Sequence, residues 1–300
     1  MKNSVNLVIL PTYKCSQNCP YCLFGHLKDS SKTLDLVWLE ENLSKIFFKF
    51  SVIETSVEGG EISELSDFYF DVFFKLLKLY TKKLNVCTNF VNFHKSLIDN
   101  ADIIEVGYNF NQYSSDSKRV KDNIKAATSS GKVVIVKSLD ISVNDNRLEI
   151  LAELNKLGIK AWEIIPYQKT KYTQLDFPGY GFFEKIVKDY LKLSSCMEFS
   201  FLNKLKIEGI IKPETFPLKT VYITPNCKFG LGKFDSENNF YIEEYETIED
   251  LEKNLEIQQN EQILLCDKCK YKVRCLANRY FNPNTVTKIE CSGYKGLLKK

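Results

Sequence analysis

Residues 5–22 read Val5-Asn-Leu-Val-Ile-Leu-Pro-Thr-Tyr-Lys-Cys15-Ser-Gln-Asn-Cys19-Pro-Tyr-Cys22. The apolar run over residues 5–11 predicts a first β-strand, and three cysteines follow it. Their spacing, C-x3-C-x2-C, lets three thiolates bind three irons of a [4Fe-4S] cube and leaves the fourth iron without a protein ligand. An iron with an open position can bind and reduce a small molecule, so the motif indicates an enzyme rather than an electron carrier.

A zinc site is the competing interpretation of the same cysteines. His26 lies four residues after Cys22, and three cysteines with one histidine form a common tetrahedral zinc site. The motif stands where a predicted strand passes into a loop, and related motifs follow downstream, which favours the cluster.

Composition limits the class of protein. The chain has 300 residues, of which 44% are hydrophobic, enough for a barrel-sized domain and a smaller one. The net charge of +3 argues against a dedicated nucleic-acid-binding protein. We find neither a run of about 20 apolar residues for a membrane span nor a secretory signal, so we expect a cytoplasmic protein without a membrane partner. In that compartment, the ten cysteines indicate metal or cluster binding rather than disulfides.

Short apolar runs alternate with helix-like segments over most of the chain, which predicts an α/β fold with a parallel sheet. We expect residues 1–195 to form a partial (β/α)6 TIM-like barrel, with its chemistry at the carboxyl ends of the strands. The predicted strands are 5–11, 52–58, 84–89, 103–108, 133–138 and 161–166. The predicted helices are 34–49, 66–81, 93–100, 117–130, 147–157 and 180–194.

Residues 196–300 are expected to form a second, smaller domain. It begins with a strand over 220–224 and a β-hairpin of 229–234 and 240–245, followed by a charged helix over 247–259. Four cysteines then follow, and four thiolates can saturate a second cube or, alternatively, bind one zinc ion. They are Cys266, Cys269, Cys275 and Cys291.

The segment Glu58-Gly59-Gly60-Glu61 ends the second predicted strand. Glycines let the backbone approach a ligand closely, and carbonyl groups with a carboxylate accept hydrogen bonds from an ammonium group. The alternative is an ordinary turn at a strand end.

The cysteine triad, with Tyr21 before its last cysteine, and the Gly-Gly-Glu segment resemble the radical S-adenosylmethionine (radical SAM) superfamily. This resemblance implies a partial barrel whose open iron binds the amine and carboxylate of S-adenosylmethionine (SAM). Two positions depart from the family pattern: Ile62 replaces a proline, and Phe90 replaces the glycine of Thr-Asn-Gly. The resemblance assigns SAM contacts to Gly59, Gly60 and Glu61 (amine), Asn89 (adenosine), Lys137 and Ser138 (ribose or carboxylate) and Ile165 (adenine).

The C-terminal cysteines resemble the SPASM/twitch extension of such enzymes. Arg279 stands where that motif has a further cysteine, and Tyr241-Ile242-Glu243 stands where it has Tyr-Pro-Cys. The resemblance therefore implies one auxiliary [4Fe-4S] cluster instead of two. Cys227 is left over, and three special roles compete: a relic, an alternative ligand, or a thiol that donates a hydrogen atom to a substrate radical. A small buried hydrophobic residue is the default.

The implied activity is reductive cleavage of SAM to a 5′-deoxyadenosyl radical, which removes a hydrogen from the substrate. We expect an oxidoreductase that matures a ribosomally made peptide (RiPP) by cross-linking, thioether formation or epimerisation. A sugar or amino-acid dehydrogenase or mutase is the alternative, and a zinc-stabilised binding module is a third. The expected partners are a peptide or small-molecule substrate and a one-electron donor such as flavodoxin or ferredoxin. A first strand near residue 5 also suggests a separate leader-peptide-binding protein.

Overall fold

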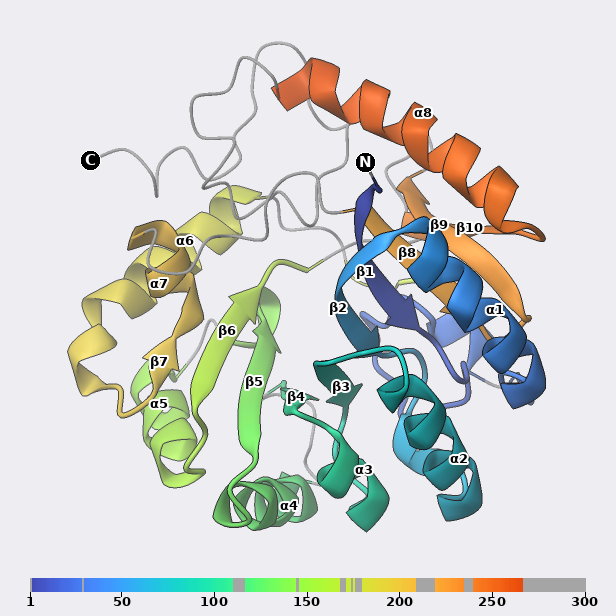
Figure 1. Cartoon of the computed structure of the whole chain (residues 1–300). Coiled ribbons are helices and arrows are strands. Elements are labelled where there is room, and N and C mark those ends of the chain that lie inside the picture. Colours follow the sequence, from blue (N-terminus) through green and yellow to red (C-terminus); the bar gives the residue numbers. More distant parts are fainter. Residues whose placement is uncertain are drawn as a thin grey trace.

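The chain folds around one ten-stranded sheet, seen in a computed structural model (Figure 1). The strand order is β10-β9-β8-β1-β2-β3-β4-β5-β6-β7. The structure describes residues 2–28, 30–109, 117–143, 146–167, 171–173, 175, 180–208, 219–234 and 240–266.

Strands and helices alternate in the first two thirds of the chain, as predicted. Each strand from β1 to β6 pairs in parallel with the next. The strands are β1 (Ser4–Ile9), β2 (Ser51–Val57), β3 (Leu84–Thr88), β4 (Ile103–Gly107), β5 (Val133–Leu139) and β6 (Ala161–Ile165). The helices are α1 (Leu36–Lys49), α2 (Asp67–Lys78), α3 (Lys95–Asn100), α4 (Ser117–Ser129), α5 (Arg147–Lys156) and α6 (Tyr180–Lys192). The predicted elements are thus confirmed, with ends that shift by up to three residues.

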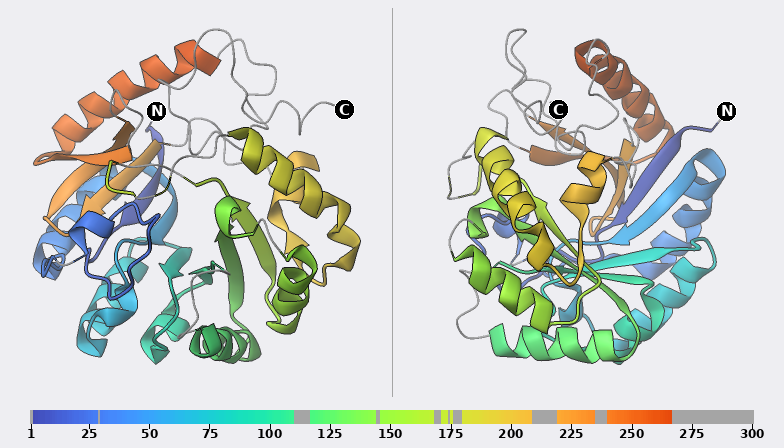
Figure 2. Two further views of the ribbon diagram at one scale, coloured as in Figure 1. Left: turned by 180° about the vertical axis from the view of Figure 1, so that it is seen from behind. Right: turned by 90° about the vertical axis from the view of Figure 1, so that its left-hand side faces the viewer.

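The two faces of the sheet differ in chemistry because successive strand residues point to opposite sides. One set, which includes Val86, Ile104, Val136 and Ile164, packs under the helices in the main core. Figure 2 shows that the sheet curves and that the helices lie along its outer side. We call the side of β1–β6 that faces away from this core the inner face.

The hairpin predicted for the second domain extends the same sheet. β8 (Lys219–Thr224) pairs in parallel with β1, and β9 (Lys228–Phe234) and β10 (Phe240–Tyr245) continue it as antiparallel strands. The sheet is therefore continuous across the predicted domain boundary at residue 195.

Helix α8 (Ile248–Cys266) lies beside the hairpin (Figure 1). Lys49 of α1 forms an ion pair with Glu252 at 2.7 Å, and the Gln258 amide donates to the Gly232 carbonyl at 2.8 Å. The helix is longer than the predicted 247–259, and none of the described helices is long and apolar enough to span a membrane.

Several short elements were not predicted from the sequence. β7 (Ser200–Phe201) pairs in parallel with β6 at the sheet edge, and α7 (Leu202–Glu208) follows it. Two-residue strands and single helical turns show no periodicity that a sequence could reveal. The 3-10 turns are η1 (Gly25–Leu27), η2 (Ile62–Glu64), η3 (Asp140–Ser142) and η4 (Ser194–Cys196).

A buried carboxyl group joins the ends of β5 and β6. Asp140 is fully buried, and its Oδ1 accepts hydrogen bonds from the backbone amides of Ile141 at 2.8 Å and Tyr167 at 3.0 Å. Its Oδ2 is buried without a hydrogen-bond partner. Burial raises the pKa of Asp140 from 3.8 to about 6, because the ionised form loses its hydration.

This raised pKa predicts how stability depends on pH. Ionisation of Asp140 disfavours the folded state, so its destabilising effect grows as the pH rises from about 4 through 6. In Asp140→Asn the side-chain oxygen still accepts both amides, but nothing ionises. We expect the variant's free energy of unfolding, relative to wild type, to rise by about 1–3 kcal/mol between pH 4.5 and pH 8. Urea titrations at both pH values measure this, and an equal difference at both would contradict it.

Candidate functional site

The three N-terminal cysteines lie in one folded loop after β1. The Cys22 amide donates to the Cys19 carbonyl at 3.1 Å, and the Gly25 amide donates to the Cys22 carbonyl at 3.3 Å. The Cys15 amide donates to the Lys28 carbonyl at 3.3 Å, which closes the loop. All three thiols are partly buried and none forms a disulfide. We call residues 12–28 the cysteine loop.

The surroundings of these thiols oppose ionisation. Burial, together with repulsion from Glu61, Cys19 and Glu64, raises the pKa of Cys15 to about 12. Burial also raises the pKa of Cys22, with a contribution from Cys19. Thiolates here need a positively charged partner, and a cluster of iron ions supplies one because ligating thiols are deprotonated. The donor set therefore fits a [4Fe-4S] cluster.

The described residues give no support to the zinc interpretation. Among them, no group of three or more His, Cys, Asp or Glu side chains could hold a metal ion. A cube binds each cysteine through a different iron, so its ligands need not surround a single ion. His26 instead stacks on Tyr172, with 3.6 Å between ring centroids. Burial and Lys171 lower the pKa of His26.

The Gly-Gly-Glu segment holds the cysteine loop by its backbone. The Gly60 amide donates to the Thr12 carbonyl at 2.8 Å, and the Glu61 amide donates to the Lys14 carbonyl at 2.7 Å. A Cβ atom on Gly60 would lie 2.2 Å from the Lys14 oxygen, and one on Gly59, with φ at +125°, would lie 2.6 Å from the Thr12 oxygen. In this structure the close approach of these glycines is to the cysteine loop, and the predicted approach to a ligand stays a prediction.

The Glu61 carboxylate joins the ends of β2 and β3. It accepts hydrogen bonds from the Thr88 hydroxyl at 2.6 Å, the Asn89 amide at 2.7 Å and the Ser63 amide at 3.0 Å. Burial raises its pKa, and these hydrogen bonds oppose that shift. The predicted contact with an ammonium group is thus replaced, for the side chain, by contacts within the protein.

Glu64 is a site residue that sequence reasoning missed. Its Oε1 accepts a hydrogen bond at 2.6 Å from the amide of Ser16, the residue after the first cysteine. An isolated glutamate in a predicted loop carries no signal of such a role, because the contact spans 48 positions of the chain.

Asn89 and Phe90 form a tight turn after β3. The Asn89 Oδ1 accepts from the Val91 amide at 3.0 Å, and Phe90 has a φ of +59°. This is the left-handed conformation that glycine favours, so the chain keeps the backbone shape of Thr-Asn-Gly at a cost of about 1–2 kcal/mol. Tyr21 and Ile165 are both partly buried, one in the cysteine loop and the other at the end of β6.

Lys137 and Ser138 point to opposite faces of β5. The Lys137 Nζ lies 2.6 Å from Glu105 Oε2 in an ion pair. Ser138 is fully buried, donates to the Tyr108 carbonyl at 2.7 Å and accepts from Trp162 Nε1 at 3.1 Å. These contacts correct the expectation for Ser138: its hydroxyl serves the packing under the helices and does not face a ligand.

Cys227 lies in the turn between β8 and β9. It has a φ of +57°, its amide donates to the Thr224 carbonyl at 3.0 Å, and its side chain packs against the main core. This position favours the default reading, a small hydrophobic residue, over a hydrogen donor.

The second cysteine group lies outside the described residues. Only the backbone of Cys266 is described, as the last residue of α8, and Cys269, Cys275 and Cys291 follow it. The auxiliary cluster therefore stays a prediction.

A small apolar cluster joins the cysteine loop to the hairpin. Val8, Leu10 and Tyr13 form it, and partly buried side chains of the loop and hairpin pack against them: Phe24, Leu27, Tyr222 and Ile242. A Cβ atom on Gly230 of β9 would lie 2.5 Å from Ile242 Cγ2, so glycine provides the space for this packing. The cluster shields one side of the cysteine loop from water.

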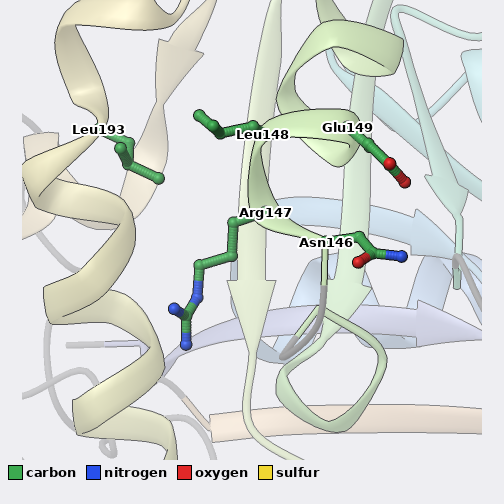
Figure 3. A pocket seen from close by; sticks show the side chains of 5 residues that line it. All are labelled: Asn146, Arg147, Leu148, Glu149 and Leu193. Carbon is green, nitrogen blue, oxygen red and sulfur yellow. The ribbon is translucent and has the colours of Figure 1, made fainter.

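An open hollow at the start of α5 is separate from this site (Figure 3). Asn146, Arg147, Leu148, Glu149 and Leu193 line it. Arg147 forms an ion pair with Asp189 of α6 at 3.0 Å. None of these residues contacts the cysteine loop or the Gly-Gly-Glu segment, so we assign the hollow no part in the site.

The glycine contacts predict the effect of adding one methyl group. We expect Gly60→Ala to lower the free energy of unfolding by about 1–3 kcal/mol, because the methyl group overlaps backbone atoms, and to reduce the iron bound after anaerobic reconstitution. Gly181→Ala in α6 is the control, since its added Cβ meets no atom within 4 Å. Denaturant titrations and iron analysis test this, and equal values for the two variants would contradict it.

Comparison with known proteins supports the fold. No protein-family model and no curated protein matches the sequence. The structure of anSMEcpe with bound AdoMet and Cp18Cys peptide is 13% identical with a TM-score of 0.69, covering 98% of this chain and 95% of that chain. SuiB of Streptococcus suis bound to S-adenosylmethionine is 14% identical with a TM-score of 0.64, covering 94% and 76%.

A further structure, SuiB of Streptococcus suis bound to precursor peptide SuiA, is 15% identical with a TM-score of 0.57. That match covers 76% of this chain, which spans only 59% of the SuiB chain. The chain therefore shares the mixed α/β fold of these solved structures, of which anSMEcpe and one SuiB structure hold S-adenosylmethionine.

Proposed function

We propose that this protein is a radical SAM enzyme whose cluster is bound by Cys15, Cys19 and Cys22. The observation that carries the proposal is the docking of the cysteine loop on the Gly-Gly-Glu segment, through the backbone hydrogen bonds that the amides of Gly60 (2.8 Å) and Glu61 (2.7 Å) donate to Thr12 and Lys14. When bound, the cluster and SAM supply an electron and a 5′-deoxyadenosyl radical that abstracts hydrogen from the substrate.

The chain's own residues bind and orient these groups. Carbonyl groups of the Gly-Gly-Glu segment are hydrogen-bond acceptors for the SAM amine, while the Glu61 carboxylate fixes the β3 end by holding the Asn89 amide. Lys137, on the inner face, would bind the SAM carboxylate or ribose, and Asn89 and Ile165, at strand ends, would contact the adenosine. Tyr21 precedes Cys22 in the cysteine loop.

We propose a ribosomally made peptide as the substrate, modified by cross-linking, thioether formation or epimerisation. Support comes from the shared fold: SuiB has been seen with the precursor peptide SuiA, and anSMEcpe with the Cp18Cys peptide. Among the described residues β10 is an edge strand of the sheet, and an edge strand offers backbone groups to an extended peptide.

We further propose that Cys266, Cys269, Cys275 and Cys291 bind one auxiliary [4Fe-4S] cluster that accepts an electron from the substrate radical. The support is their number and spacing, which suffice to saturate a cube. Flavodoxin or ferredoxin would serve as the electron donor, in the cytoplasm where thiols stay reduced.

Iron analysis tests the two-cluster proposal. Anaerobically reconstituted wild type should hold about eight irons, and a variant with Cys15, Cys19 and Cys22 all changed to alanine should hold about four. The variant should also release no 5′-deoxyadenosine from SAM under reducing conditions.

The matched control is Cys196→Ala, which removes an exposed thiol of η4. It should keep the wild-type iron content and SAM cleavage. Zinc in place of iron, or unchanged SAM cleavage in the triple variant, would reject the proposed function.

A further inference from the structure

Five polar side chains form a row along the inner face, near the carboxyl ends of the strands. Each comes from a different strand from β2 to β6, or from the residue after it, and each neighbours a main-core residue that points the other way. Cys87 pairs in register with Glu105, and Lys137 pairs with Glu163. We call Glu58, Cys87, Glu105, Lys137 and Glu163 the charged row.

The centre of the charged row is a connected network. The Cys87 thiol donates to Glu105 Oε2 at 2.9 Å, and Lys137 Nζ lies 2.6 Å from the same oxygen. Glu105 and Glu163 are both 8% exposed. Burial, Glu105 and Glu58 raise the pKa of Cys87 well above its usual value, so the thiol stays neutral beside these carboxyl groups.

An independent observation on the same face indicates a missing hydrogen-bond donor. Asn85 lies two residues before Cys87 on β3 and is 3% exposed. Its Nδ2 donates to Glu54, whereas its Oδ1 is buried without a hydrogen-bond partner. An unsatisfied buried acceptor costs about 1–3 kcal/mol, which a donor from a ligand would recover.

We propose that the charged row binds a cationic nitrogen of the substrate, the ammonium or guanidinium group of a lysine or arginine side chain. The row contains three carboxyl groups and one ammonium group, and a negative potential inside a curved, partly buried face attracts cations. Its members lie one or two residues from the strand ends, so within about 7 Å of the carboxyl edge of the sheet at 3.3 Å per residue. The assignment to a peptide side chain rests on the proposed function.

Binding of two matched probes tests this inference. The probes are N-acetyl-lysine methylamide and N-acetyl-norleucine methylamide, titrated calorimetrically into the reconstituted full chain with SAM present. We expect the lysine probe to bind about tenfold more tightly, equivalent to about 1.4 kcal/mol. The preference should shrink as ionic strength rises towards about 0.15 M and beyond.

Two isosteric variants locate the binding to the charged row. Glu163→Gln and Glu58→Gln should each weaken binding of the lysine probe about tenfold and leave the norleucine probe unchanged. Glu252→Gln is the control, because Glu252 lies on α8 and pairs with Lys49 of α1 at 2.7 Å, so the change removes a carboxylate without altering the charged row or Asn85. It should keep the wild-type preference. Circular dichroism confirms folding, and two separate row variants guard against one that fails to fold.

The outcomes separate this inference from the proposed function. Equal binding of the two probes by wild type, or an unchanged preference in both folded row variants, overturns the inference even if SAM is cleaved. A lysine preference that depends on Glu58 and Glu163 supports it, even if 5′-deoxyadenosine never forms and the proposed function fails.

Discussion

The candidate site depends on one close approach between two backbone segments. Gly59 and Gly60 lie against Thr12 and Lys14 so tightly that no other residue type fits there without a shift of backbone atoms. This contact fixes the first turn of the cysteine loop at the end of β1, because the segment that carries the glycines is itself the end of the neighbouring strand β2.

Side chains add to this backbone contact: Glu61 binds the end of β3 and Glu64 binds the Ser16 amide. His94 Nε2 donates to the Ser63 carbonyl at 2.7 Å and so ties the same turn to α3. The cysteines are thus held by a framework that spans three strands.

The sequence predicted the fold well where a pattern of apolar residues repeats over many positions of one element. The six βα units follow from apolar runs and amphipathic helices, and five of the six helices repeat one pattern over ten or more residues. The same reasoning failed at short elements: β7 has two residues, and the cluster of Val8, Leu10 and Tyr13 has no period. It also misjudged contacts over long separations. Gly59 and Gly60 were expected to let a ligand approach, and a sequence does not show that the backbone of residues 12–14 lies against them.

The expected ligand contact of Ser138 was wrong for a different reason, and the geometry of a strand could have excluded it. Adjacent residues of a strand point to opposite faces, so Lys137 and Ser138 cannot both face one ligand. Val134 and Val136 share the face of Ser138, and their apolar character marks it as the core side. Lys137 therefore had to point to the inner face, where the structure places it against Glu105. The alternation of side chains along β5 would have kept Lys137 as a candidate ligand contact and excluded Ser138.

The same alternation along the strands shows why the charged row is unusual. Strands of a parallel sheet covered on both faces usually read as continuous apolar runs, yet β4, β5 and β6 are each interrupted by a charged residue at Glu105, Lys137 and Glu163. Removing a charge from water costs several kcal/mol even when it is paired, and a valine or isoleucine at these positions would avoid that cost. The helix-covered face keeps its apolar residues, so the cost is confined to the inner face. Buried charges on the inner face of β4, β5 and β6 give the sheet a polar interior that suits binding of a ligand rather than stability alone.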